Sequence, residues 1–175
     1  MYIFLIILSC LLWLGSLWAL RGRQILAPAL SYAALLLLSL ARKDGYPLLP
    51  INSTILMGWV VMTIVVMFIV ILQPEAVRRQ TRGTLYMIIG AVTGMSVGLL
   101  GFTFSSNLQL LYAAMIGGVA VGIFCGFLLY TRTPEGEPVA PRSGNFFRYL
   151  LAKGFPTAIT VMQLGVALVL TIACL

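Results

Sequence analysis

Residues 50–72, PINSTILMGWVVMTIVVMFIVIL, contain no charged side chain. A helix of about 20 apolar residues covers the hydrocarbon core of a bilayer, which is about 30 Å thick. This stretch is therefore long enough and apolar enough to cross a membrane as one helix.

The rest of the chain has a similar composition. Of its 175 residues, 61% are hydrophobic and 9% are charged, none is histidine, and the mean hydropathy is +1.07. A soluble globular domain typically carries about 25% charged residues. The composition thus excludes a soluble domain and a disordered chain, and it predicts an all-α, polytopic membrane protein.

Six apolar runs are predicted to be transmembrane helices, at about 2–20, 25–41, 50–72, 84–104, 108–130 and 155–175. The second run is the shortest; with Pro28 in its first turn, it would reach only about 25 Å at about 1.5 Å per residue. Local thinning of the bilayer, a tilted neighbour or a partial re-entry would accommodate it. No connection is long enough to separate domains, so we expect residues 1–175 to form a single transmembrane domain.

The basic residues lie between the apolar runs and predict the orientation. Short loops rich in Lys and Arg stay on the cytoplasmic side. The first, third and fifth connections hold most of the cations, namely Arg21, Arg23, Arg78, Arg79, Arg82, Arg132, Arg142, Arg148 and Lys153. We therefore expect a multi-pass protein of the cytoplasmic (inner) membrane with both termini on the non-cytoplasmic side. We attribute the net charge of +7 to these loop residues, which determine orientation. For this reason we expect no nucleic-acid partner.

Glycine recurs at every fourth residue in two consecutive runs. The helix-packing candidates are Gly90, Gly94 and Gly98 in the fourth run and Gly118, Gly122 and Gly126 in the fifth. In lipid there is little hydrophobic driving force for helix association, so the dispersion contacts that glycine permits between closely spaced backbones have to supply the attraction. This glycine zipper predicts an antiparallel hairpin within the chain. The alternative is that one glycine face joins another copy or a partner membrane protein.

The last run has one face that is smaller and more polar than the rest. At about 100° per residue, its polar-face candidates fall within about 120° of arc; they are Thr157, Thr160, Gln163 and Thr171. Gln163 is expected near the middle of the bilayer, where an amide needs a partner. It would either hydrogen-bond across a helix contact or line a polar path. Its possible partners are scattered, at Tyr32, Thr54, Thr63, Thr93 and Ser96.

A short basic and aromatic segment, NFFRYLLAK at residues 145–153, precedes that run. Such a segment can lie in the headgroup layer, where Arg148 and Lys153 would contact anionic lipid. The alternative is that it extends the sixth helix.

Catalysis is not expected. Histidine is absent, no acidic residue lies inside a predicted span, and no lysine is placed to form a buried amine. Cys10, Cys125 and Cys174 have no metal-ligand spacing. We therefore expect no cofactor and no metal, and of the enzymatic classes only phosphoryl chemistry led by arginine is left open.

Two functions remain. The first is a non-catalytic assembly or scaffold subunit that contacts other membrane helices, in a homo-oligomer or a heteromeric complex. The second is a small permease or channel, uniport-like or passive, that works as an oligomer. A proton-coupled carrier is disfavoured because such carriers keep an ionisable residue inside the membrane.

Overall fold

A computed structural model describes residues 2–43, 46–47, 51–79, 82–102, 108–141 and 143–173. The long helices are α1 (Tyr2–Gly22), α2 (Leu26–Leu40), α3 (Ser53–Leu72), α5 (Thr84–Phe102), α6 (Leu108–Thr131) and α8 (Phe155–Ala173). The short elements are α4 (Glu75–Arg79), the 3-10 turn η1 (Glu137–Val139), α7 (Phe146–Tyr149), the π-helical turn η2 (Leu150–Gly154), and an antiparallel pair of β1 (Arg42–Lys43) with β2 (Tyr46–Pro47). The described chain is thus mostly helical, with one short pair of strands and the turns between elements.

Five helical segments are long and apolar enough to cross a membrane: Tyr2–Gly22, Ser53–Leu72, Thr84–Gly101, Gln109–Thr131 and Phe146–Leu170. The chain is therefore a multi-pass helical membrane protein by length and composition. The helix in the second predicted run, α2, has 15 residues. At 1.5 Å per residue it reaches only about 22 Å, which is short of the hydrocarbon core.

The ends of α3 follow from its flanking residues. Before the helix, the side-chain oxygen of Asn52 accepts a hydrogen bond from the Thr54 backbone N–H at 3.4 Å. An asparagine in this position satisfies one of the N–H groups that a helix start leaves without an intrahelical partner. Gln73 and Pro74 follow the helix. A residue that precedes a proline rarely adopts helical geometry, so α3 ends at Leu72.

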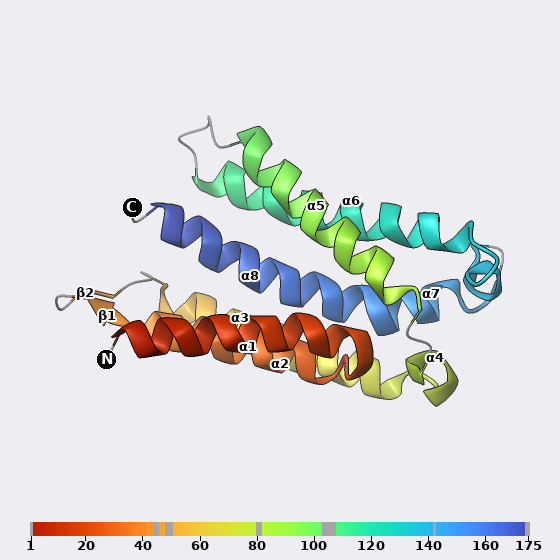
Figure 1. Cartoon of the computed structure of the whole chain (residues 1–175), viewed down its shortest axis with the longest axis horizontal. Coiled ribbons are helices and arrows are strands. Elements are labelled where there is room, and N and C mark those ends of the chain that lie inside the picture. Colours follow the sequence, from red (N-terminus) through yellow and green to blue (C-terminus); the bar gives the residue numbers. More distant parts are fainter. Residues whose placement is uncertain are drawn as a thin grey trace.

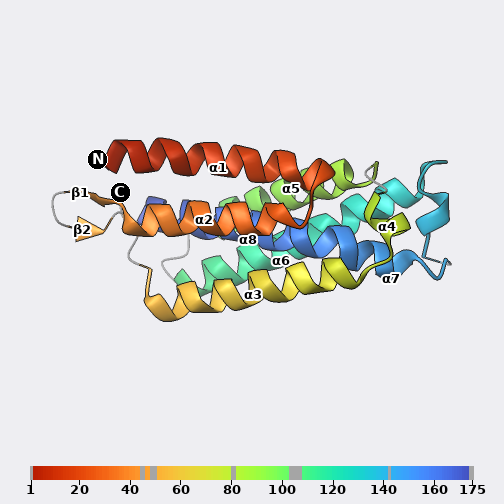
Figure 2. The same ribbon diagram turned by 90° about the horizontal axis from the view of Figure 1, so that it is seen from below.

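The helices form a bundle with α8 at its centre (Figure 1). α8 lies between the α5–α6 pair on one side and α1, α2 and α3 on the other (Figure 1). In the view from below, α1 and α3 lie at opposite edges of the bundle, with α2 and α8 between them (Figure 2). The start of α1 and the end of α8 lie at the same end of the bundle as the β1–β2 pair (Figure 1). The opposite end carries α4 and α7.

The last spanning segment begins earlier than the predicted start at residue 155. α7, η2 and α8 follow one another without a break, so helical structure runs from Phe146 to Ala173. The segment at residues 145–153 therefore extends the helix, which is the second of the two alternatives given above. A π-helical turn widens the helix locally and often marks a functional position.

The glycines of α5 and α6 bring two backbones into contact. A Cβ atom built on Gly90 would overlap the carbonyl oxygen of Gly122, and one built on Gly94 would overlap that of Gly118. Gly98 and Gly126 face the backbone at Ala114 and Tyr86 instead. All six predicted packing glycines thus lie in one contact within the chain, which is the most extensive helix contact of the fold.

This contact predicts that an added methyl group costs more at Gly122 than at a glycine with open space around it. Gly122→Ala places a methyl group against the backbone of α5, and we expect a loss of about 1–3 kcal/mol in stability from overpacking. Gly15→Ala in α1 is the control, because nothing lies within 4 Å of its added Cβ. Unfolding in a detergent titration, followed by circular dichroism, measures both variants. Equal stability of the two would contradict the contact.

Candidate functional site

Three buried polar side chains join three helices at the centre of the bundle. The Gln163 amide of α8 accepts a hydrogen bond from the Ser31 hydroxyl of α2 and donates one to Thr63 Oγ1 of α3 at 3.0 Å. Ser31 and Gln163 have no exposed surface, and Thr63 is 5% exposed. We call these three residues the Gln163 cluster. Gln163 therefore bonds across helix contacts, the first of the two roles considered for it.

The position of Ser31 follows from the small residues around it. Ala27, Ser31 and Ala34 recur at spacings of four and three along α2 and are all fully buried, so this face lets neighbouring helices approach. Two side chains of α1 donate hydrogen bonds to the backbone of α2 at the same residues. Trp13 Nε1 donates to the Ser31 carbonyl at 3.2 Å, and the Ser9 hydroxyl donates to the Ala34 carbonyl at 2.6 Å.

Two further residues of the polar face of α8 are also turned inward. Thr157 is buried and donates to the Lys153 carbonyl at 2.7 Å, one turn earlier along the chain. Thr160 is buried, and its hydroxyl has no hydrogen-bond partner within the described chain. Thr157, Thr160 and Gln163 thus put polar groups inside the bundle, where lipid does not reach them. The side chain of Thr171 lies outside the described residues.

Of the scattered partners proposed for Gln163, the structure brings one to it, Thr63. Thr93 and Ser96 donate to carbonyls one turn earlier in their own helix. Ser31 was not among the predicted partners. The signal that could have identified it is its place between Ala27 and Ala34, on the small face of the second helix.

The structure corrects the prediction that Arg148 and Lys153 both contact lipid headgroups. Arg148 is exposed, but Lys153 is fully buried. Lys153 belongs to the turn η2, so it lies in a continuous helix packed into the bundle rather than in a segment at the membrane surface. The expectation that no lysine forms a buried amine is wrong for the same reason.

Aromatic side chains hold this helical turn in place. Tyr149 stacks on Phe127 of α6 with ring centroids 5.5 Å apart, and Phe146 packs on the same ring at 4.8 Å. The Gly83 backbone N–H donates to the Tyr149 hydroxyl at 3.1 Å. Phe146 and Tyr149 are both buried, so the turn that follows them, including Lys153, is drawn into the core.

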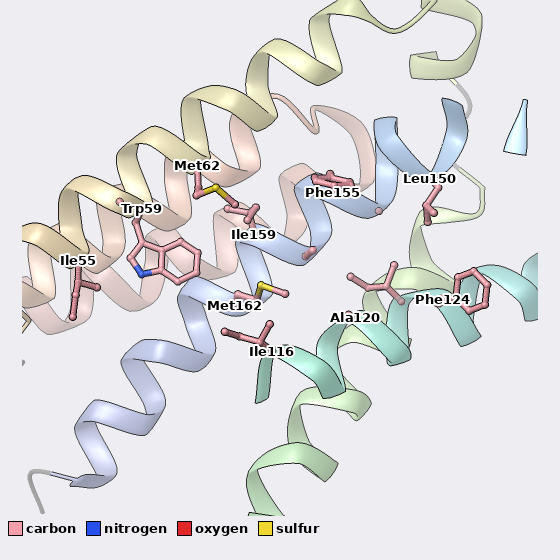
Figure 3. Close-up of a pocket in the computed structure, with 14 residues that line it drawn as sticks. Ile55, Trp59, Met62, Ile116, Ala120, Phe124, Leu150, Phe155, Ile159 and Met162 are labelled. Atoms are coloured by element: carbon pink, nitrogen blue, oxygen red, sulfur yellow. The ribbon is translucent and has the colours of Figure 1, made fainter. Parts of the chain in front are cut away.

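An apolar groove separates α3 from α6, and its floor is α8 together with η2. Its volume is about 650 Å³. The walls include Ile55, Gly58, Trp59 and Met62 from α3 and Ile116, Ala120, Ile123 and Phe124 from α6, and the floor includes Leu150, Gly154, Phe155, Ala158, Ile159 and Met162 (Figure 3). We call it the α3–α6 groove. None of the polar residues of α8 lines it, so this opening and the Gln163 cluster are separate features.

The groove opens toward the surroundings of the bundle. Residues on its three sides are about half exposed, including Ile55 at 52%, Phe124 at 46% and Phe155 at 41%. In a protein with several membrane-spanning helices, such apolar surface faces lipid. Sequence patterns gave no sign of the groove, because a gap between helices depends on how they cross.

These features define a class, a multi-pass helical membrane protein with a polar interior contact and an apolar surface groove. No family model matches the chain, and no similar protein was found among curated proteins or solved structures. The function therefore has to be inferred from the geometry.

The Gln163 cluster predicts a specific loss of stability. Gln163→Leu removes both hydrogen bonds between helices, while the Ser31 and Thr63 hydroxyls keep the backbone carbonyls of Pro28 and Trp59 as acceptors, so we expect a loss of about 1–2 kcal/mol. Thr160→Val is the matched control one turn away, because it removes a buried hydroxyl that bonds to no described residue. It should be neutral or stabilising. Equal losses in the two variants, measured by unfolding in detergent, would contradict the role of Gln163.

Proposed function

We propose that this protein is a non-catalytic integral membrane protein that acts as an assembly or scaffold subunit. One observation carries the proposal: the polar groups of the Gln163 cluster bond to one another and have almost no exposed surface. A solute path needs polar groups that a passing solute can reach. Here these groups close a contact between helices, which supports a role in holding helices together.

The second candidate, a small permease or channel that works as an oligomer, has less support. The α3–α6 groove is apolar and its lining excludes Thr157, Thr160 and Gln163. A polar solute would have to leave water for a wall of hydrocarbon side chains, which costs several kcal/mol for each unsatisfied polar group. Uniport by an oligomer would need a different polar surface, formed between copies.

The surface for a partner helix is proposed on the outer side of α6. The glycines predicted for that role, such as Gly94 and Gly122, are occupied within the chain. Ala113 and Gly117, four residues apart, are exposed, and nothing lies within 4 Å of a Cβ built on Gly117. Small residues at this spacing permit close approach of another helix in lipid.

We further propose six crossings, with both termini outside a cytoplasmic membrane. Successive long helices run in alternate directions through the bundle, which supports an even number of crossings if α2 is counted (Figure 1). α2 is short, but it packs against α1, α3 and α8 and has five buried residues, so lipid contacts only part of its surface.

Reporter fusions test the proposed topology. A reporter active only outside the cytoplasm should work when fused to either terminus and should fail when inserted after Arg79, because cation-rich loops stay inside. A cytoplasm-active reporter at the same three positions should give the opposite pattern. Activity of the first reporter after Arg79 would contradict the orientation, and opposite results at the two termini would contradict six crossings.

Copurification tests the proposed function. In mild detergent we expect a membrane protein, or further copies of the chain, to remain bound to the wild type and to be lost from Gly117→Leu. Gly15→Leu on α1 is the control, because it also has open space around the added side chain. Purified protein in liposomes should give no solute flux above protein-free vesicles. Flux that disappears in Gln163→Leu would overturn the scaffold proposal in favour of a permease.

A further inference from the structure

The α3–α6 groove has the properties of a binding site that the Gln163 cluster does not explain, and it adjoins the contact surface proposed on α6. Its lining is apolar on all sides, and its rim is open to the bilayer. Its volume of about 650 Å³ lies within the range of small-ligand sites, about 300–1,000 Å³. We infer that it holds one acyl chain of a lipid whose anionic headgroup lies at the cation-rich end of the bundle.

The groove has the length and lining that suit an acyl chain. Along α8 its floor runs from Leu150 to Met162, which is about 18 Å at 1.5 Å per residue. Its walls and floor are hydrocarbon and its rim opens to the bilayer, where lipid chains are the surrounding apolar groups. The charges at the adjoining end of the bundle support a lipid as the source of that chain.

The charge of the adjoining end selects the headgroup. The floor of the groove starts at Leu150, directly after α7, and Arg148 of α7 is exposed. Apart from the buried Lys153, the described residues at this end of the bundle include seven of the eleven cations in the sequence, against three of the four acids. One of these acids, Glu135, forms an ion pair with Arg82 at 2.6 Å. An anionic headgroup is therefore favoured here over a zwitterionic one.

Specificity has to come from this headgroup and from the shape of the groove. An acyl chain gains no hydrophobic free energy on moving from bulk lipid into an apolar groove, because both surroundings are hydrocarbon. A basic residue near an anionic surface contributes a favourable term for each charge. The groove thus retains a lipid by fit and selects it by charge, and we assign the selecting contact to Arg148.

Native mass spectrometry tests this inference on the full-length protein. The protein is taken from bilayers of equal parts phosphatidylglycerol and phosphatidylcholine with identical chains, and the lipids that remain bound in mild detergent are identified. We expect the wild type to retain one phosphatidylglycerol in preference to phosphatidylcholine. Arg148→Gln should lower that preference about fivefold, the factor for one basic residue at an anionic surface, and should leave a lipid bound.

Groove variants locate the bound lipid. Ala158→Leu fills the floor and should abolish retention, and Gly58→Leu does the same from the wall on α3, where nothing lies within 4 Å of an added Cβ. Gly15→Leu on α1 is the control and should retain the lipid. The Gly58 variant keeps the test decisive if Ala158→Leu fails to fold.

Three results would overturn the inference. These are equal retention of both lipids by the wild type, retention unaffected by the groove variants, and a bound membrane protein that Gly58→Leu displaces. The last result would identify a partner helix as the occupant. Loss of lipid from Gly58→Leu with partners still bound separates this inference from the proposed function, because Gly58 lies on α3, away from the contact surface proposed on α6.

Discussion

The backbone contact between α5 and α6 is the interaction on which the arrangement of the other helices depends. In lipid, helices gain little by hiding apolar side chains from one another, so association relies on close packing and on hydrogen bonds. Gly90 and Gly94 of α5 meet Gly122 and Gly118 of α6 with no room for a Cβ between them. This fixes the relative position of the two helices and gives α8 a rigid surface, where its Gly165 meets Met95 and Met115.

The second means of association, hydrogen bonding, acts on the opposite side of α8. Gln163 reaches α2 through Ser31 and α3 through Thr63, so one side chain links two helices to α8. A buried polar group that is fully bonded specifies one arrangement, because sliding either helix would leave the amide unsatisfied in hydrocarbon. This is the physical reason for preferring a structural role of Gln163 over a transport role.

Sequence patterns predicted the parts of the fold that depend on local periodicity. The spacing of Gly90, Gly94 and Gly98 indicated a close helix contact, and the isolated amide of Gln163 indicated an interhelical bond. The patterns failed where tertiary packing decides. Lys153 was placed at the membrane surface because charge marks the ends of spans, but the aromatic contacts of Phe146 and Tyr149 draw its turn into the bundle. The α3–α6 groove had no sequence signature.

The groove is a consequence of these two contacts rather than a packing fault. α6 cannot rotate toward α3 without separating its glycines from α5, since each is already at the closest approach a backbone allows. α3 cannot move toward α6 without drawing Thr63 away from Gln163, because this hydrogen bond joins α3 to α8 and the buried Val66 and Val70 pack with Ile159 of the groove floor. The two walls are therefore positioned by their contacts with α5 and α8. A groove positioned in this way is the reason for proposing that one lipid has a defined place on this surface.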